Sequence, residues 1–396
     1  MTGHVRLGDV VDVASGQVDP REEPYCDWPH VGGDNIESGS GRLFGLRTAR
    51  ELSFISGKYE FGPEDVLYSK IRPALNKVAL PDFKGICSAD MYPLRPRSGR
   101  IERRYLAYLL QHDGFLEFAE KHSSRTNIPK INREALLSYE FPLPELPEQH
   151  RIADVLEKAD SIRRKRKEAI ALTEELLRSA FLEMFGDPVT NSNGWPTKTL
   201  DEIGTDFSYG TSTKCDTDQT GRAVLRIPNV VGGQIDMSEL KYAHMGLDEA
   251  QRFMLLRGDL LFVRSNGNPN FIARSAVFNR AEPMLFASYL IRARFPRNSP
   301  VSSGFVHALF SADSFRRRLL KEATTTAGNY NINTTGLGRQ PIMLPPAALQ
   351  ARYSRVEEAI WQLREKHQQC SRDAEVLFAS LSERVFRGGL RHVDFS

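Results

Sequence analysis

Two long stretches of the chain carry apolar residues in alternating steps of three and four positions. In residues 147–186 this spacing begins at Ile152 and continues to the end of the stretch, with Arg166 in one of the apolar positions. Apolar residues spaced in this way lie on one face of an α-helix and suit packing against a second helix. Gly186 and Pro188 are typical of a helix end. We therefore expect one long amphipathic helix over residues 147–186.

The same pattern occurs again in residues 347–390, where His367 occupies the position that Arg166 has in the first stretch. If the two helices pack antiparallel, we expect each apolar position to meet its counterpart in the other helix. The segments before the long helices also recur in matching order. The chain is therefore predicted to contain two copies of one unit. The expected divisions are domain 1–146, helix 147–186, domain 187–346, helix 347–390 and tail 391–396.

Each predicted domain begins with short strand patterns separated by turns and ends with a helix and a proline-rich strand. A turn with an acidic residue leads into an apolar strand that ends in a basic residue, both at 62–70 and at 257–264. A helical pattern at 105–121 matches another at 305–321. We therefore predict an α+β fold class, with two pseudo-symmetric globular α/β domains separated by two long helices that pack as an antiparallel coiled coil.

The composition fits this two-domain organisation. A chain of 396 residues is too long for one typical core. Hydrophobic residues make up 40% and charged residues 26%, which is ordinary for a globular protein and argues against a disordered or fibrous chain. The formal net charge is only +3, so a surface that binds nucleic acid would have to be local.

Several functional classes lack their sequence signals. The four cysteines are far apart and form no CxxC pair, which argues against a disulfide framework or a metal site. The N-terminus lacks the pattern of a secretory signal, and no apolar run approaches the roughly eighteen residues of a membrane span, so we expect a cytoplasmic protein without a membrane partner. Phosphate-loop, HExxH and Asn-Pro-Pro-Tyr motifs are also missing, so we predict no catalytic residues in this chain.

The polar loops that follow the recurring strands and helices are candidates for DNA contact. Sequence-specific binding needs Arg, Lys, Asn or Gln side chains that reach base edges, with further polar groups on phosphates. The alternative is that Asn and Gly in these loops only permit tight turns. The candidate DNA-binding residues are Lys70, Arg72, Lys77, Asn127, Lys130, Asn132, Lys214, Arg264, Asn266, Asn268, Arg274, Asn329, Tyr330 and Asn333.

One motif at the start of the first long helix, Glu-Gln-His-Arg-Ile-Ala at 148–153, is specific enough to compare with known families. Together with the paired units, the Gly-Asp-Leu-Leu-Phe strand at 258–262 and the Pro-Leu-Pro strand at 142–144, it resembles specificity subunits of type I restriction-modification systems. The resemblance covers essentially the whole chain. It implies two target-recognition domains held apart by the helices, each binding one half of a bipartite site in double-stranded DNA.

The resemblance also implies partners. Methylation subunits, expected to be two, and endonuclease subunits in complexes that cleave DNA would carry S-adenosylmethionine, ATP and Mg²⁺, with no cofactor in this chain. The second long helix keeps the Gln and Arg of the starting motif but lacks its Glu and Ile. One rival hypothesis is a fused restriction and methylation enzyme, for which the chain has neither the length nor the motif. The other is a scaffold whose helices assemble partners without reading DNA. The candidate partner-binding residues are Gln149, Arg151, Gln350, Arg352 and Trp361.

The basic run at 163–167 allows two interpretations. It could be a solvated helix face with one polar residue in the helix contact, or it could bind the DNA backbone or an acidic partner.

Overall fold

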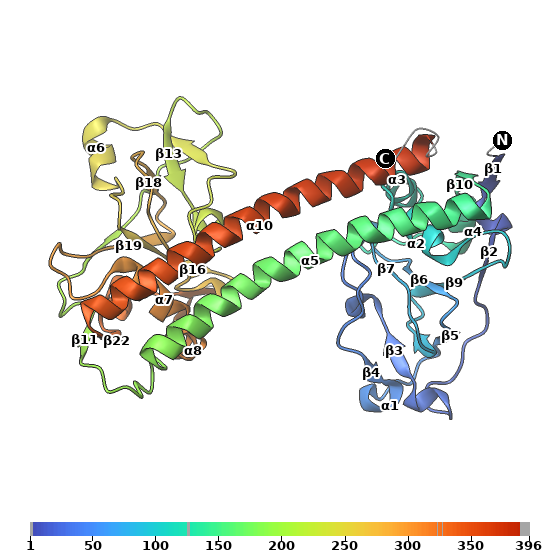
Figure 1. Cartoon of the computed structure of the whole chain (residues 1–396), viewed down its shortest axis with the longest axis horizontal. Coiled ribbons are helices and arrows are strands. Elements are labelled where there is room, and N and C mark those ends of the chain that lie inside the picture. Colours follow the sequence, from blue (N-terminus) through green and yellow to red (C-terminus); the bar gives the residue numbers. More distant parts are fainter. Residues whose placement is uncertain (1–2, 125–126, 323, 327, 389–396) are drawn as a thin grey trace. The chain divides into compact units, whose positions relative to one another are not determined.

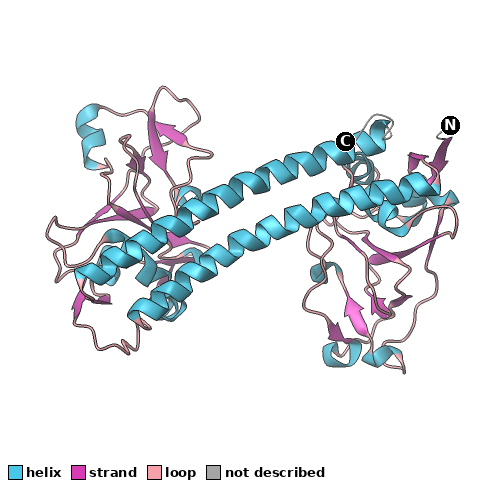
Figure 2. Cartoon of the chain, viewed as in Figure 1, coloured by secondary structure: helices cyan, strands magenta, loops and turns pink. Residues whose placement is uncertain are grey.

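The computed structural model describes residues 3–124, 127–322, 324–326 and 328–388, and it combines many short strands with two very long helices (Figure 1, Figure 2). The chain forms two compact units: unit 1 comprises residues 1–169 and 367–396, and unit 2 comprises residues 170–366. The long helices are α5, Leu146–Phe185, and α10, Ala347–Gly388, which confirms both predicted helices. Each long helix is divided between the two units. The predicted tail 391–396 lies outside the described residues.

Unit 1 is built mainly from short strands. They are β1 (Gly3–Arg6), β2 (Val11–Val13), β3 (Pro29–Val31), β4 (Arg47–Thr48), β5 (Tyr59–Phe61), β6 (Val66–Ser69), β7 (Val78–Ala79), β8 (Gly85–Cys87), β9 (Met91–Pro96) and β10 (Glu140–Leu143). The short α-helices are α1 (Ala49–Leu52), α2 (Arg103–Gln111), α3 (Asp113–Lys121) and α4 (Arg133–Leu137). The strands form sheets of order β2-β9-β6-β7 and β4-β3-β8-β5 and the antiparallel pair β1-β10.

Unit 2 repeats this plan with additions. Its strands are β11 (Thr197–Thr199), β12 (Asp206–Tyr209), β13 (Arg222–Leu225), β14 (Lys241–Ala243), β15 (Leu260–Val263), β16 (Ser265–Asn266), β17 (Ser275–Val277), β18 (Leu285–Phe286), β19 (Leu290–Arg294), β20 (Thr324–Thr326), β21 (Asn329–Asn331) and β22 (Pro341–Met343). Its short α-helices are α6 (Leu247–Arg252), α7 (Ser303–Ser311), α8 (Asp313–Glu322) and α9 (Thr334–Gly338). The order β12-β19-β15-β17 matches β2-β9-β6-β7, and the pair β11-β22 matches β1-β10. The predicted α+β class and the internal repeat are therefore present in the fold.

The acidic residue of the recurring turn has the same structural role in both units. The buried Asp65 carboxylate accepts the guanidinium Nε–H of Arg95 at 2.8 Å, and Asp259 pairs with Arg294 at 2.7 Å. Each aspartate also accepts a backbone N–H of its own turn at 2.8 Å. A buried carboxylate needs such partners, because an unpaired one would be strongly disfavoured. The turn is thereby fixed to the strand that lies next to it.

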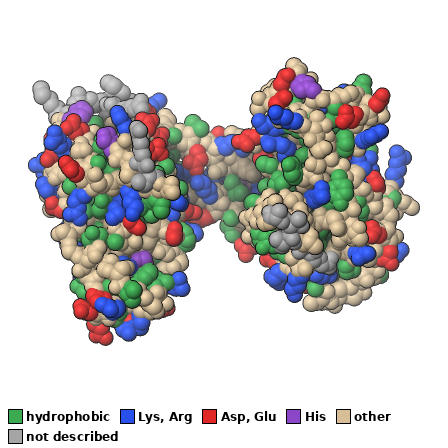
Figure 3. Space-filling view, turned by 180° about the vertical axis from the view of Figure 1, so that it is seen from behind, with side chains coloured by type: hydrophobic (Ala, Val, Ile, Leu, Met, Phe, Trp, Pro, Cys, Tyr) green, Lys and Arg blue, Asp and Glu red, His purple; other side chains and the backbone are tan. Residues whose placement is uncertain are grey.

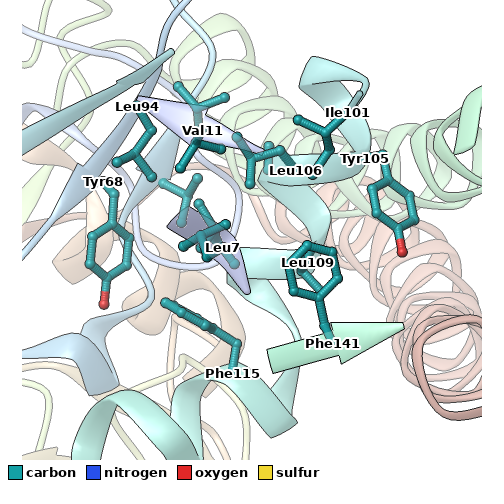
Figure 4. Close-up of a cluster of buried hydrophobic side chains, with 14 of the residues drawn as sticks. Leu7, Val11, Tyr68, Leu94, Ile101, Tyr105, Leu106, Leu109, Phe115 and Phe141 are labelled. Carbon is teal, nitrogen blue, oxygen red and sulfur yellow. The ribbon is translucent and has the colours of Figure 1, made fainter. Parts of the chain in front are cut away.

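The hydrophobic core of unit 1 includes the ends of both long helices. Figure 4 shows side chains from β2, β6, β9 and α2 meeting in this core. The same cluster contains Ile152 and Leu156 of α5 and Val385 and Phe386 of α10. Each fully buried side chain of this size contributes about 1.5–3 kcal/mol. The helix ends are therefore part of the domain core and not separate from it.

Unit 2 incorporates the opposite helix ends in the same way. Phe181 and Phe185 of α5 belong to its core together with Tyr353 of α10. The ring of Tyr353 lies 5.7 Å from that of Phe181 and 5.4 Å from that of Phe185, in edge-on contacts. Such aromatic pairs contribute about 0.5–1.5 kcal/mol beyond their buried area. The two helices are thus joined to each other and to the domain by one aromatic cluster.

A buried glutamine fixes the start of α5. The Gln149 side-chain Nε2 donates to the carbonyl oxygens of Arg100 at 3.1 Å and Pro144 at 2.9 Å, and its Oε1 accepts the backbone N–H of Glu102 at 2.8 Å. Glu102 is the N-cap of α2. One side chain therefore ties together the start of α5, the segment before it and the start of α2.

Gln350 makes the same three contacts at the start of α10. Its Nε2 donates to the carbonyl oxygens of Pro300 at 2.8 Å and Pro345 at 2.9 Å, and its Oε1 accepts the backbone N–H of Ser302 at 3.1 Å. Both glutamines are buried and their amides are occupied inside the units. The structure therefore gives Gln149 and Gln350 a structural role, in place of the partner contact expected from the sequence.

The two long helices pair antiparallel inside each unit, and one ion pair occurs twice. In unit 1, Arg163 Nη1 lies 3.5 Å from Glu375; in unit 2, Arg364 Nη2 lies 2.8 Å from Glu174. The same number of positions separates Arg163 from Arg364 as separates Glu174 from Glu375. Arg163 therefore lies opposite Glu375, the counterpart of Glu174. It does not lie opposite Arg364, its own counterpart, so the expectation that each position meets its counterpart was wrong here. In an antiparallel pair, only the central positions can face their counterparts.

The basic run at 163–167 contributes several of its side chains to contacts between or along the helices. Buried Arg163 pairs with Asp160 at 2.6 Å and donates to the carbonyl oxygen of Gly39 at 2.8 Å. Lys167 lies 3.2 Å from Glu375. The run is therefore not a uniformly solvated face.

The predicted apolar stripe is only partly buried. Ile152 is buried in the core of unit 1, but Ile162, Leu176, Leu363 and Leu377 are between 44% and 50% exposed. An α-helix has 3.6 residues per turn, so a stripe with a repeat of 3.5 drifts around a straight helix. These exposed residues are counterparts of each other, Ile162 of Leu363 and Leu176 of Leu377. The same apolar surface is therefore presented twice.

Among the described helices, none combines the length and apolar character that a membrane span requires.

Replacing Gln149 with Leu should destabilise unit 1. The change removes three hydrogen bonds and leaves a buried N–H and two carbonyl groups without this partner, and each unsatisfied group costs about 1–3 kcal/mol. We expect the free energy of unfolding of unit 1 to fall by about 2–4 kcal/mol. Hydrogen exchange read on peptides from residues 85–124 measures this loss separately from unit 2.

Two matched variants control this prediction. Gln350→Leu should weaken protection in peptides from unit 2 instead. Arg151→Ala, which removes an exposed ion pair with Glu148, should change stability by less than about 1 kcal/mol. Unaltered exchange in Gln149→Leu would show that the buried amide does not fix the helix start.

Candidate nucleic-acid interface

Four side chains of unit 2 lie at the same end of its four-stranded sheet. Tyr209 ends β12, Tyr289 precedes β19, Arg264 follows β15 and Arg274 precedes β17. Because neighbouring strands of this sheet run antiparallel, the end of one strand lies beside the start of the next. Arg264 and Arg274, which the sequence proposed as DNA contacts, are therefore brought together.

Unit 1 places basic residues at the corresponding sheet end. Lys70 follows β6, and its backbone N–H donates to the carbonyl oxygen of Asp90 at 3.0 Å. In unit 2, the backbone N–H of Arg264 donates in the same way to the carbonyl oxygen of Tyr289 at 2.9 Å. Lys77 precedes β7, in the position that Arg274 has before β17. The backbone hydrogen bonds identify Lys70 and Arg264 as structural counterparts.

The second set of predicted loops joins the first set in both units. In unit 2, β16 pairs with β21, which places Asn266 opposite Tyr330 and next to Asn329. In unit 1, the N–H of Arg72 donates to the carbonyl oxygen of Pro129 at 2.8 Å, and the neighbouring residue pairs with Lys130 across an isolated bridge. Loops far apart in the sequence therefore form one surface at each sheet end.

The guanidinium group of Arg264 packs against an aromatic ring, and most of its N–H groups make no hydrogen bond within the described residues. Its guanidinium lies 4.6 Å from the ring centroid of Tyr209, and Nη1 donates to the carbonyl oxygen of Ser288 at 3.4 Å. Within the described residues its Nε and Nη2 have no hydrogen-bond partner. The exposed ring of Tyr289 stands beside it in the sheet. A guanidinium positioned in this way can donate to a base edge or a phosphate.

The side chain of Lys70 makes closer contacts within its unit than that of Arg264, its counterpart. Its Nζ donates to the carbonyl oxygen of Ala89 at 2.6 Å and lies 5.3 Å from the ring of Tyr92. The side chain is only 21% exposed. The two units therefore present different chemistry at the same position, which is what two different recognition surfaces require.

Four of the candidate asparagines use their side-chain oxygen to shape the backbone. Asn132 caps α4 by accepting a backbone N–H at 2.8 Å, and Asn333 caps α9 at 2.7 Å. Asn266 and Asn268 each accept the N–H two residues ahead, at 2.8 and 3.0 Å. The alternative role in turns, left open by the sequence, is present at these four positions.

Of the remaining candidates, some contact other groups of the protein and others are exposed to solvent. The Lys77 Nζ donates to the carbonyl oxygen of Gly33 at 2.5 Å, and Lys130 lies 3.4 Å from Asp90. Tyr330 is half-buried. Lys130 is exposed despite its contact with Asp90, and the other well-exposed side chains are those of Arg72, Asn127, Lys214, Arg274 and Asn329.

The sequence did not single out Tyr209 and Tyr289 as site residues. The feature of the sequence that could have identified them is an aromatic residue next to small and polar residues at the end of a strand. Gly210 follows Tyr209, and a Cβ at that glycine would lie 2.2 Å from the carbonyl oxygen of Phe286. The chain therefore needs glycine there, and the close approach holds the loop that carries Tyr209 against the sheet.

The other expected partner residues have different surroundings. Arg151 lies 3.0 Å from Glu148 and Arg352 is exposed. Trp361 is half-buried under the guanidinium of Arg364, whose Cζ is 4.9 Å from the ring. Burial raises the pKa of Glu357 to about 7, against the lowering effect of a hydrogen bond with Trp361. Trp361 is thus partly used in the packing of unit 2.

The surface charge is mixed rather than uniformly basic. On the face drawn in Figure 3, Lys and Arg side chains are interspersed with Asp and Glu over each unit. In the part of the chain that the structure describes, no three His, Cys, Asp or Glu side chains are grouped so that they could hold a metal ion. Charge selectivity must therefore come from local clusters such as the sheet ends.

Comparison with known proteins identifies relatives of the chain. A family profile described as "Type I restriction modification DNA specificity domain" matches residues 3–172. The type I restriction enzyme EcoDI specificity subunit of Escherichia coli is 35% identical over 190 residues, 47% of this chain and 42% of that protein. The EcoKI specificity subunit of Escherichia coli strain K12 is 24% identical over 353 residues, 84% of this chain and 75% of that protein. The EcoDI alignment thus spans less than half of that relative.

Solved structures share the fold over nearly the whole chain. The S subunit of a type I restriction-modification system from M. genitalium aligns with a TM-score of 0.58 at 13% identity and covers 98% of this chain and 96% of that one. A chain from a study of complex assembly and conformational transition of the type I system aligns with a TM-score of 0.54 at 19% identity and covers 98% of each. Residues 3–172 therefore match the specificity domain of type I restriction-modification systems, and the chain as a whole shares the fold of the solved S subunit over nearly its full length.

Proposed function

We propose that this chain selects the DNA sequence for a type I restriction-modification complex, with each unit binding one half of a bipartite double-stranded site. The observation that carries the proposal is the repeated sheet end. Each unit gathers a basic residue after the strand of the recurring turn, Lys70 or Arg264, with a second polar loop next to it. The different engagement of these two residues supports two different half-sites.

The chemistry of unit 2 suits recognition of guanine. An arginine whose guanidinium is fixed over an aromatic ring can donate two parallel hydrogen bonds to guanine O6 and N7 in the major groove. Arg264 keeps Nε and Nη2 available for such a pair, and Tyr209 limits the entropy lost on binding. Exposed Lys214 and Arg274 of unit 2 are available for phosphates, as is Arg72 in unit 1.

The long helices are proposed to dock the methylation subunits. The exposed apolar pairs Ile162 with Leu363 and Leu176 with Leu377 supply two equivalent surfaces, which supports two such subunits. Arg151 and Arg352 add a charged group near the start of each helix. In this proposal the chain is not an enzyme, and S-adenosylmethionine, ATP and Mg²⁺ belong to the methylation and endonuclease subunits.

Mapping methylated adenines tests the proposal directly. The chain would be expressed with the methylation subunit encoded beside it, in a host without adenine methylation of its own. We expect one split motif with a fixed gap. A complex that forms without any methylated motif would instead support the scaffold hypothesis.

Replacing Arg264 with Gln should alter only the half-site of unit 2. Loss of the guanidinium should reduce discrimination at one guanine by about 1–3 kcal/mol, or roughly 5- to 150-fold. The same methylation map measures this change. Lys70→Gln is the matched variant and should leave that half-site unchanged. If Arg264→Gln leaves both half-sites intact, Arg264 does not read a base.

Lengthening both helices should widen the gap between the half-sites. Four residues inserted after Glu168 and four after its counterpart Gln369 lengthen each helix by about 6 Å, or about one turn. Both copies of the ion pair between Arg and Glu can then persist. We expect the gap to grow by one or two base pairs, at roughly 3.4 Å per pair, while both half-site sequences stay the same. An unchanged gap with intact helicity would refute a role of the helices as spacers.

A further inference from the structure

Unit 2 contains a cluster of arginines on which the proposed base contacts do not depend. The Arg274 Nε donates to the carbonyl oxygen of Asn270 at 3.1 Å, and the Arg316 Nη2 donates to the same oxygen at 2.8 Å. A shared acceptor holds the two guanidinium groups close together. Arg178 of α5 lines the same cavity of about 580 Å³ as Arg274 and Arg316. Three cationic groups from different parts of the chain thus meet in one hollow.

Glu174, Asp187, Asp313 and Glu357 also line the cavity, but few carboxylate oxygens lie close to these three guanidinium groups. Among the described residues, no carboxylate lies within 4.0 Å of a guanidinium nitrogen of Arg274 or Arg316. Arg178 lies 3.8 Å from Asp313 and 3.9 Å from Glu174, and neither distance is a hydrogen bond. Glu174 also pairs with Arg364 at 2.8 Å, so its charge is already shared.

Burial and neighbouring positive charges both act on the guanidinium of Arg316. Burial, together with the charges of Arg274 and Arg178, lowers the pKa of Arg316 to about 10, while Asp313 acts in the opposite direction. A bound anion would relieve this repulsion. Its binding would therefore be favoured by charge and by guanidinium donors that have no partner in the described residues, including Nη1 of Arg316 and Nη2 of Arg274.

The cluster has no equivalent in unit 1. By the matching order of elements, Leu116 of α3 stands where Arg316 stands in α8, and Ala379 of α10 stands where Arg178 stands in α5. Lys77, the counterpart of Arg274, donates to a backbone carbonyl oxygen at 2.5 Å. Only the position of Arg274 is basic in both units, whereas the positions of Arg178 and Arg316 are basic in unit 2 alone. The folding of the repeated unit therefore does not require the cluster.

We propose that Arg178, Arg274 and Arg316 form a phosphate-binding site in unit 2 that holds the DNA backbone beside the half-site. The proposal rests on the proposed function of the chain. Its location supports DNA as the source of the phosphate: the N–H of Val263 donates to the carbonyl oxygen of Arg274 at 2.8 Å, and Val263 immediately precedes Arg264. The cluster thus adjoins the same sheet end as the proposed base contact. Arginine also matches the geometry of phosphate oxygens.

The salt dependence of DNA binding tests the site. The full chain, assembled with its methylation subunits, would be titrated with cognate and unrelated duplexes over a range of KCl concentrations. For Arg274→Gln and Arg178→Gln, we expect the slope of log K against log[KCl] to become less steep by about 0.9 for a lost phosphate contact. Affinity for both duplexes should fall by the same factor, and the methylated motif should not change. Arg355→Gln, on an exposed part of α10 outside the cavity, should match the wild type.

Arg316→Gln is the stronger variant, but it also removes hydrogen bonds to the carbonyl oxygens of Asn270 and Ile272. The salt slope of Arg316→Gln is evidence for the site only if this variant has the same thermal unfolding midpoint as Arg355→Gln. Arg178→Gln loses no hydrogen bond within the described residues, so it tests the site even if Arg316→Gln is destabilised.

A second measurement distinguishes DNA from free phosphate. The full chain alone should unfold at a higher temperature in sodium phosphate than in sodium chloride of equal ionic strength, and Arg274→Gln should remove the difference. If phosphate stabilises the chain but the DNA salt slopes of the variants equal that of the wild type, the DNA assignment is overturned. The same holds if the variants lose only their methylation subunits, because an acidic partner surface then occupies the site.

These outcomes separate the inference from the proposed function. A wild-type complex that does not discriminate cognate from unrelated DNA would contradict sequence selection, while a change of salt slope on either duplex would still support the phosphate site. A wild-type complex that discriminates, together with unchanged slopes and unchanged phosphate stabilisation in all three variants, would leave sequence selection standing and refute the phosphate site.

Discussion

The packing of the long helices into the domain cores is the constraint on which the rest of the structure depends. The first turns of α5 belong to the core of unit 1 through Ile152 and Leu156, and Tyr353 of α10 belongs to that of unit 2. A buried amide at the start of each helix then connects it to the neighbouring short helix. Because unsatisfied buried polar groups are costly, this connection also resists rotation of the helix against its domain. Each proposed recognition surface therefore belongs to a unit whose core includes the ends of both long helices.

The second constraint is the antiparallel register of the helices. One ion pair, Arg163 with Glu375 and Arg364 with Glu174, occurs once in each unit. Ion pairs of partly exposed side chains contribute little stability, about 0–1 kcal/mol, but they disfavour shifted registers in which like charges meet. The pairs therefore matter more for alignment than for stability. A fixed alignment also leaves matching apolar residues exposed on both helices.

The sequence predicted the larger features well because they depend on local pattern. Both long helices, the repeat and the recurring acidic turn follow from spacing and order, which need no knowledge of tertiary contacts. The role of Gln149 could not be predicted in this way. The sequence placed Gln149 among the partner-binding residues, and only the positions of three backbone groups explain why it is buried.

The candidate site was predicted in part for the same reason. The sequence named the loops around Arg264 and Tyr330 as separate candidates, and only the pairing of β16 with β21 shows that they are neighbours. The sequence could not say that Asn132 and Asn333 act as helix caps while Arg264 keeps its donors, because that distinction lies in hydrogen-bond geometry. Tyr209 was overlooked because an aromatic residue at a strand end is ordinary until its ring is seen beneath a guanidinium.

The division of each long helix between the two units has a consequence for how such chains can diversify. Along the chain, the division between the two units falls in the middle of α5, after Ala169, and in the middle of α10, after Lys366. Recombination between two related genes within these helix centres would transfer a complete core, with its own helix ends and its own buried glutamine. A crossover at a domain edge, such as residue 146 or 186, would instead separate core residues from their partners. Genetic exchange in mid-helix is therefore the route by which one recognition unit could be replaced without repacking either core.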